Sequence, residues 1–74
     1  MVMERQEIIR IFAANLRAER AKKRYTLEKL SEMADITPEY LARLESEKYS
    51  PSLVVIVNLA LALEVSVEKL VSLS

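Results

Sequence analysis

The 74-residue chain contains no cysteine, no histidine and no glycine, and it has only two prolines. Without cysteine, no disulfide can stabilise a domain of this size, and without cysteine or histidine none of the common zinc sites can form. Cys–His and Ser–His pairs for nucleophilic catalysis are excluded, as are glycine-rich loops that bind nucleotide phosphates. The sequence therefore predicts neither an enzyme nor a metalloprotein, and we expect no cofactor.

Long hydrophobic runs are also missing. The longest apolar stretch, Leu53 to Leu63, is interrupted by Asn58 and is much shorter than the roughly 20 residues that span a bilayer. The N-terminal segment has acidic residues within its apolar stretch and no small-residue cleavage site, unlike a signal peptide. We expect a cytoplasmic protein without a membrane partner.

Neither sign of charge is in excess, because eleven basic and eleven acidic side chains give a formal net charge of zero. The two signs are nevertheless separated along the chain. Residues 1–24 carry seven basic and three acidic side chains, a net charge of +4, whereas residues 25–47 carry two basic and six acidic ones, a net charge of −4. A neutral total is not typical of a nucleic-acid-binding domain, but here it conceals a dipolar chain.

What the sequence does contain is a helical pattern. Ile8, Ile9, Phe12 and Leu16 recur at spacings of three and four residues, the period of an amphipathic helix. No segment shows the sustained alternation of a strand. A domain of this length buries only about 60% of the surface that its unfolded chain exposes, so we expect efficient helix packing or oligomerisation to add to its stability.

Hydroxyl residues mark the starts of further helices. Thr26, Thr37 and Ser66 are each followed two positions later by a glutamate, and Ser52 follows Pro51. A hydroxyl at this place accepts a hydrogen bond from a backbone N–H, and a nearby carboxylate is stabilised by the positive end of the helix dipole. The expected helices span residues 4–23, 27–34, 38–46, 53–63 and 67–72.

The second and third of these helices are joined by residues 35–37 alone. A turn of this length between two short helices is typical of a helix-turn-helix, whose second helix enters the major groove of DNA. Leu30, Leu41 and Leu44 fall where such a unit needs internal contacts, and Ala34 is small enough to let the helices approach. We therefore predict one all-α domain over residues 1–74, a compact five-helix bundle with a central helix-turn-helix.

The predicted helix-turn-helix and the residues that follow it resemble a known family. The motifs are TLEKLSEMADITPEYLARLESEKYSPSL and, a few residues later, NLALALEVSVEKL. They are similar to the Cro/phage-repressor (XRE-type) helix-turn-helix domain of prokaryotes, and especially to the small restriction–modification controller proteins. The resemblance covers residues 9–72 and implies a lambda-repressor-like fold.

The resemblance also implies particular features of the fold. One is an ion pair between Arg20 and Glu45, although two solvated side chains remain the alternative. The family commonly has glycine at four places where this chain has other residues. These are Arg24, Asp35, Glu47 and Glu64.

The predicted DNA contacts come from the helix-turn-helix and its flanks. Base contacts are expected from Pro38, Glu39, Ala42 and Arg43. Contacts to the DNA backbone are expected from Arg17, Thr26, Leu27, Thr37, Lys48, Tyr49 and Ser50. Leu27 stands where the family usually has glutamine. For several of these residues a structural role is the alternative: Pro38 as a helix starter, Glu39 as a partner of the helix dipole, and Arg17 as part of a solvated helix face.

The helix predicted over residues 53–63 is apolar nearly all the way round. Val54, Val57 and Leu61 form a second stripe beyond the face that the core needs. A helix of this kind is covered on both faces. We expect a second copy of the chain to cover the stripe in a homodimer, as the resemblance also implies. The alternative cover is the N-terminal segment, Met1 to Met3.

Two functions follow from these observations. The first is a sequence-specific transcription regulator that binds double-stranded DNA as a homodimer on a pseudo-palindromic operator. The second is a module with the helix-turn-helix fold that binds a protein partner and has little or no DNA affinity. The net charge of −4 over residues 25–47 and the shortage of hydrogen-bond donors at the base-reading positions favour the second.

Overall fold

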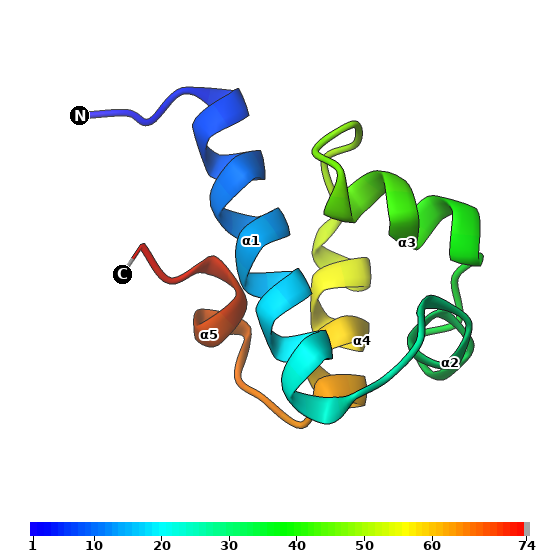
Figure 1. Cartoon of the computed structure of the whole chain (residues 1–74). Helices are drawn as coiled ribbons and strands as arrows, with labels where there is room; N and C mark the ends of the chain where they lie inside the picture. The colour runs from blue at the N-terminus through cyan, green and yellow to red at the C-terminus, as the bar shows by residue number, and fades with distance from the viewer. Residues whose placement is uncertain (74) are drawn as a thin grey trace.

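The computed structural model describes residues 1–73, and this range contains five α-helices and no β-strand (Figure 1). The helices are α1 (Arg5–Lys23), α2 (Leu27–Met33), α3 (Pro38–Glu45), α4 (Leu53–Leu63) and α5 (Val67–Val71). The predicted all-α fold is therefore confirmed. Each predicted helix end lies within one residue of the observed end, because caps and prolines set these boundaries locally.

Four helices begin with the same hydrogen bond. The hydroxyl before the helix accepts from the backbone N–H of the third residue after it, so one otherwise unpaired donor is satisfied. The donor and acceptor atoms are 3.0–3.2 Å apart in the pairs Lys29–Thr26, Tyr40–Thr37, Val55–Ser52 and Lys69–Ser66. Only α1 starts without a side-chain cap.

Four residues adopt the left-handed backbone conformation although none of them is glycine. Their φ angles are 59–67°, and they are Arg24, Asp35, Glu47 and Glu64. At each position the following residue donates a backbone hydrogen bond to the carbonyl five residues before it, the pattern that closes a helix in a Schellman turn. These are the four places where the resemblance described above would imply glycine. The chain keeps the backbone geometry without the residue that usually supplies it.

The core lies where all five helices meet. Its fully buried side chains come from every helix: Leu16, Leu30, Leu41, Leu44, Leu59, Leu63 and Leu70. In Figure 1, α1 and α4 run through the middle of the molecule, with α2 and α3 on one side and α5 on the other. Asn15 of α1 secures the C-terminal end, because its amide donates to the carbonyl oxygens of Leu70 and Ser72 at 3.1 and 2.9 Å.

Candidate nucleic-acid interface

The unit formed by α2 and α3 is packed as a helix-turn-helix. Leu30 and Ala34 on one side and Leu41 and Leu44 on the other are buried, and Ile36 in the turn packs against the same cluster. The turn closes through hydrogen bonds from the N–H groups of Asp35 and Ile36 to carbonyls of α2. Since α2 also contacts α4 and α3 contacts α1, the unit is fixed to the rest of the domain.

The outer face of α3 carries the predicted base-reading residues. Glu39 and Arg43 are exposed, and Pro38 and Ala42 are half-buried. Glu39, Ala42 and Arg43 follow Pro38 by one, four and five residues, and this spacing places all four on one side of the helix. The structure thus brings all four together on the solvent side of an anchored helix. Pro38 is also the first residue of α3, so it serves as a helix starter as well.

Two tyrosines support the C-terminal end of this face. The rings of Tyr40 and Tyr49 lie 5.8 Å apart between centroids and are tilted by 32°. The guanidinium carbon of Arg43 lies 5.9 Å from the centroid of the Tyr49 ring, within range of a cation–π interaction. Tyr40 packs against the core and is a structural residue here. Arg43 is therefore presented at the surface beside an aromatic ring.

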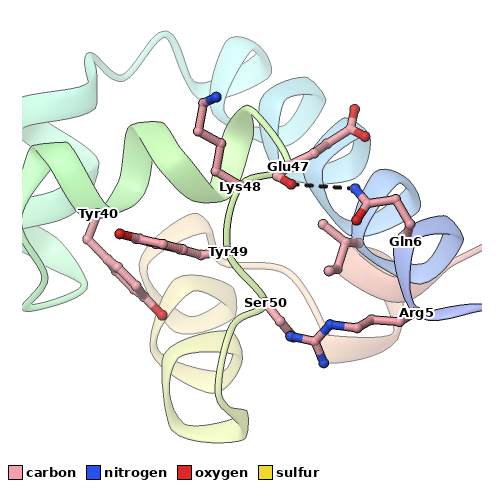
Figure 2. Close-up of a pocket in the computed structure, with 8 residues that line it drawn as sticks. Arg5, Gln6, Tyr40, Glu47, Lys48, Tyr49 and Ser50 are labelled. Carbon is pink, nitrogen blue, oxygen red and sulfur yellow. Dashed lines mark hydrogen bonds between the residues drawn. The ribbon is translucent and has the colours of Figure 1, made fainter.

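The loop between α3 and α4 carries three of the predicted backbone contacts. Lys48, Tyr49 and Ser50 are all exposed. The loop is held at its start, because the Lys48 N–H donates to the Arg43 carbonyl at 2.9 Å and the Gln6 amide donates to the Glu47 carbonyl at 3.4 Å (Figure 2). Gln6 was not singled out by its sequence, since nothing in α1 indicates that its first turn reaches this loop.

The other predicted backbone contacts have structural roles as well. The hydroxyls of Thr26 and Thr37 are helix caps, and Leu27 packs partly against the core. Arg17 is exposed, but its guanidinium donates to the backbone carbonyl of Glu45. Each of these residues therefore has a structural role that does not depend on DNA.

Arg20 and Glu45 form a two-pronged ion pair between α1 and the end of α3. Arg20 Nε lies 2.7 Å from Glu45 Oε2, and Arg20 Nη2 lies 2.9 Å from Glu45 Oε1. The third guanidinium nitrogen, Nη1, donates a hydrogen bond to the Tyr25 carbonyl at 3.0 Å. The hydrogen bond to Glu45 raises the pKa of Arg20, and Glu45 is only 7% exposed. We call this arrangement, with the Arg17 bond to the Glu45 carbonyl, the arginine clamp.

The outward face of α4 is apolar and uncovered. Leu53, Val54 and Leu61 are 73%, 67% and 71% exposed, and Val57 is also exposed. We call these four residues the α4 stripe. Met1 and Val2 are exposed too, and the N-terminal segment leads away from α4 in Figure 1. Residues 1–3 therefore do not cover the stripe.

An acidic surface accompanies the helix-turn-helix. Glu28, Glu32, Asp35 and Glu39 are exposed on α2, α3 and the turn between them, and none of the four forms an ion pair with another residue in the range 1–73. Within the same range, no three acidic side chains come together as a metal site. None of the helices in the described part of the chain is long and apolar enough to cross a membrane.

Comparisons with known proteins agree with this geometry. A family model described as helix-turn-helix matches residues 16–70. The chain belongs to this XRE-type helix-turn-helix family. Membership identifies it as a DNA-binding transcription regulator and not an enzyme.

Solved structures of helix-turn-helix proteins superimpose closely. The restriction-modification controller protein C.AhdI from Aeromonas hydrophila is 29% identical, with a TM-score of 0.81 over 84% of this chain and 94% of that one. The clp gene regulator ClgR from Corynebacterium glutamicum is 32% identical, with a TM-score of 0.82 over 85% of this chain and 67% of that one. A hypothetical transcription factor, NHTF, from Neisseria is 24% identical, with a TM-score of 0.84 over 96% and 82%, and shows the fold alone. No curated protein sequence matches the chain.

Proposed function

We propose that the protein is a sequence-specific transcription regulator that binds a pseudo-palindromic operator as a homodimer. The observation that carries this proposal is the placement of α3. Its inner face is buried in the core, and its end is held by the arginine clamp. On the opposite side of the helix Glu39 and Arg43 are exposed, and Pro38 and Ala42 are half-buried. A recognition helix must be rigidly held and open on one side to enter the major groove.

The chemistry of these side chains defines what they can read. Arg43 can donate two hydrogen bonds to the edge of a guanine, and Glu39 can accept one from the amino group of a cytosine. Pro38 and Ala42 offer apolar contacts that suit a thymine methyl group. We therefore expect each half-site to contain a G·C pair opposite Arg43 and to lose affinity when that pair is changed.

Contacts to the DNA backbone would orient α3 in the groove. Lys48, Tyr49 and Ser50 are exposed on the loop at the end of α3, and we propose that they contact phosphates. Thr26, Leu27 and Thr37 lie at the starts of α2 and α3, where backbone N–H groups can donate to phosphates. Arg17 completes the predicted set from α1.

The α4 stripe supports the dimer. Burial of Val54, Val57, Leu61 and the adjoining Leu53 against the same residues of a second copy would remove apolar side chains from water, at roughly 25 cal/mol per Å². A two-fold axis through this stripe places one α3 on each side of the dimer. Two such helices read half-sites about 34–36 Å apart, in successive major grooves.

Regulation would then follow from occupancy. A dimer bound beside a promoter blocks polymerase or recruits it, according to the position of the operator. The protein would act in the cytoplasm, at the nucleoid. Its own concentration would set the fraction of operators occupied, because dimerisation and DNA binding are coupled.

A second candidate function is favoured by the acidic surface. Glu28, Glu32, Asp35 and Glu39 would repel phosphates if they lay against DNA. A helix-turn-helix domain with weak DNA affinity would instead use this surface to bind a basic protein. In that case the protein would regulate through the partner.

The experiment that separates the two is a DNA-binding measurement at two salt concentrations. The purified protein is mixed with the duplex just upstream of its own coding sequence, and with duplexes selected from a random library. Nanomolar, salt-sensitive binding that resists competitor DNA supports the regulator. Weak binding that competitor DNA abolishes, for every selected duplex, would exclude it and favour the protein-binding module.

A further inference from the structure

A cleft lies between the first turns of α1 and the loop that joins α3 to α4. Its volume is about 460 Å³, and it is open to solvent. One wall is formed by α1, with Arg5, Gln6 and Ile9. The other is formed by α3 and the loop after it, with Tyr40, Glu47, Lys48, Tyr49 and Ser50 (Figure 2). The cleft joins two parts of the chain that are more than forty residues apart in sequence, as the Gln6–Glu47 hydrogen bond shows.

The lining of the cleft is rich in unused donors. Arg5 forms no ion pair or hydrogen bond with another residue in the range 1–73, and Figure 2 shows its side chain extending towards Ser50. The backbone N–H groups of Tyr49 and Ser50 also have no acceptor within the described residues. These groups offer one positive charge and several donors without a built-in acceptor. The Lys48 ammonium extends away from Arg5 in Figure 2 and adds a second positive charge on the other side of the loop.

The acceptors near the cleft are directed elsewhere. The Glu47 carbonyl is already bound to Gln6 at 3.4 Å, and the Glu47 carboxylate extends away from Arg5 in Figure 2. The aromatic wall is formed by Tyr40 and Tyr49, whose rings are 5.8 Å apart. A site in which a guanidinium and backbone N–H donors have no acceptor of their own suits an anion with several acceptor oxygens, such as a phosphate.

We propose that Arg5 and the Lys48–Ser50 loop form a phosphate site, and that a phosphate of the DNA backbone occupies it. This inference rests on the proposed function. Lys48, Tyr49 and Ser50 are the predicted backbone contacts at the end of α3, and Arg5 extends this surface onto α1. Since a DNA strand carries a phosphate at every nucleotide, a strand that runs from Ser50 along the cleft would bring a phosphate to Arg5. Arg5 thereby adds an anchor outside the helix-turn-helix, which helps to offset the acidic surface of α2 and α3.

The test compares the salt dependence of DNA binding for Arg5→Gln with that for a matched control, Arg10→Gln. Arg10 is also exposed on α1 and forms no ion pair or hydrogen bond through its side chain with another residue in the range 1–73, but it does not line the cleft. Each phosphate contact contributes about 0.9 to the slope of log affinity against log salt concentration. We expect Arg5→Gln to lose about this much slope and to bind several-fold more weakly, while Arg10→Gln retains the wild-type slope. Equal slopes for the two variants would overturn the proposal.

A second measurement locates the phosphate. Neutral methylphosphonate linkages are placed one at a time along the operator, and affinity is measured for the wild type and for Arg5→Gln. One linkage should weaken the wild type and leave Arg5→Gln unaffected, because the contact is already absent. If every linkage weakens both proteins equally, Arg5 contacts no DNA phosphate.

A free phosphate compound is the other source of the same ligand. Nuclear magnetic resonance titration of the DNA-free protein with inorganic phosphate and with AMP distinguishes it. Shifts at Arg5 and Ser50 that saturate, with no change in DNA salt slope for Arg5→Gln, would replace DNA with a free anion as the occupant. If wild type binds no duplex, the proposed function fails, and this titration still decides whether the phosphate site exists.

Discussion

The outer faces of α3 and α4 both face solvent, but they differ in the chemical character of their side chains. On α3 the exposed residues are polar or small, and the helix is fixed from behind by buried leucines and the arginine clamp. On α4 the exposed residues are large and apolar, with Leu61 71% exposed. A polar face is stable in water without a ligand. An exposed apolar face is unfavourable in water, and the free energy falls when it is covered.

The comparison separates two kinds of function within one small domain. Substitutions on the α3 face should change recognition and leave folding intact. Substitutions on the α4 stripe should change dimerisation. They should change DNA recognition only because the dimer is lost. Substitutions in the arginine clamp should change folding first. Three variants test this division, and a fourth tests the backbone at the end of α3; they follow from the largest expected effect to the smallest.

Leu61→Glu places a charge in the α4 stripe and should produce a monomer. Linked binding of two modules commonly gains 10²–10⁴ in affinity, so the variant should lose a factor of about this size on a two-half-site operator. Analytical ultracentrifugation measures the assembly, and titration with duplex measures the affinity. The control is Ala14→Glu, at an exposed position of α1 outside the stripe. A dimeric Leu61→Glu protein would show that the stripe is not the interface.

Glu45→Gln removes the negative charge from the arginine clamp and leaves Arg20 without its counter-ion. We expect the free energy of unfolding to fall by about 3 kcal/mol, at the lower end of the range for buried pairs, because a quarter of the Arg20 side chain remains exposed. In a domain of this size the melting temperature should fall by about 15 °C. Glu64→Gln, which breaks the exposed pair between Lys23 Nζ and Glu64 Oε1 at 2.5 Å, is the control and should have a small effect.

Arg43→Ala removes the main donor from the α3 face. Loss of one base contact should weaken operator binding by about 1–3 kcal/mol and relax the preference at a single base pair. The melting temperature should stay close to that of wild type, because Arg43 is exposed. Lys69→Ala, on α5, is the matched control. A large loss of stability with normal DNA binding would place Arg43 among the structural residues instead.

Glu47→Gly relieves a left-handed backbone position, with a φ of 67°. The strain of a non-glycine residue exceeds the entropy that glycine loses on folding, so stability should rise by about 0.5–1 kcal/mol. Glu32→Gly, inside α2, should instead lower stability by about 1 kcal/mol. Chemical denaturation measures both changes. Because Glu47 begins the loop of the cleft, the variant also tests whether loop rigidity affects DNA affinity.

Much of the fold could be predicted because its signals are local. The hydroxyl caps and Pro38 act within one turn of helix, so the boundaries of α2, α3, α4 and α5 follow from neighbouring residues. The short turn between α2 and α3 leaves them few arrangements other than a helix-turn-helix. The Arg20–Glu45 pair was implied by resemblance to a family, since no local rule connects two residues that are 25 positions apart.

The candidate site could be predicted only in part. The residues on the outer face of α3 follow from helical periodicity once the helix is placed. The bond from Arg17 to the Glu45 carbonyl and the approach of Arg5 to Ser50 could not be foreseen, because each depends on the angle at which α1 crosses α3. That angle is set by the packing of the whole core, not by the sequence of either helix.

The sequence by itself therefore determined the five helices, the helix-turn-helix and the polar or apolar character of each outer face, since these depend on interactions between neighbouring residues. Only the tertiary structure decided that the α4 stripe is uncovered and that four residues other than glycine adopt left-handed turns at the helix ends. It also decided that α1 and the α3–α4 loop form an open cleft with Arg5 in its wall. The physical reason is that solvent exposure and long-range contacts arise only when the helices pack together.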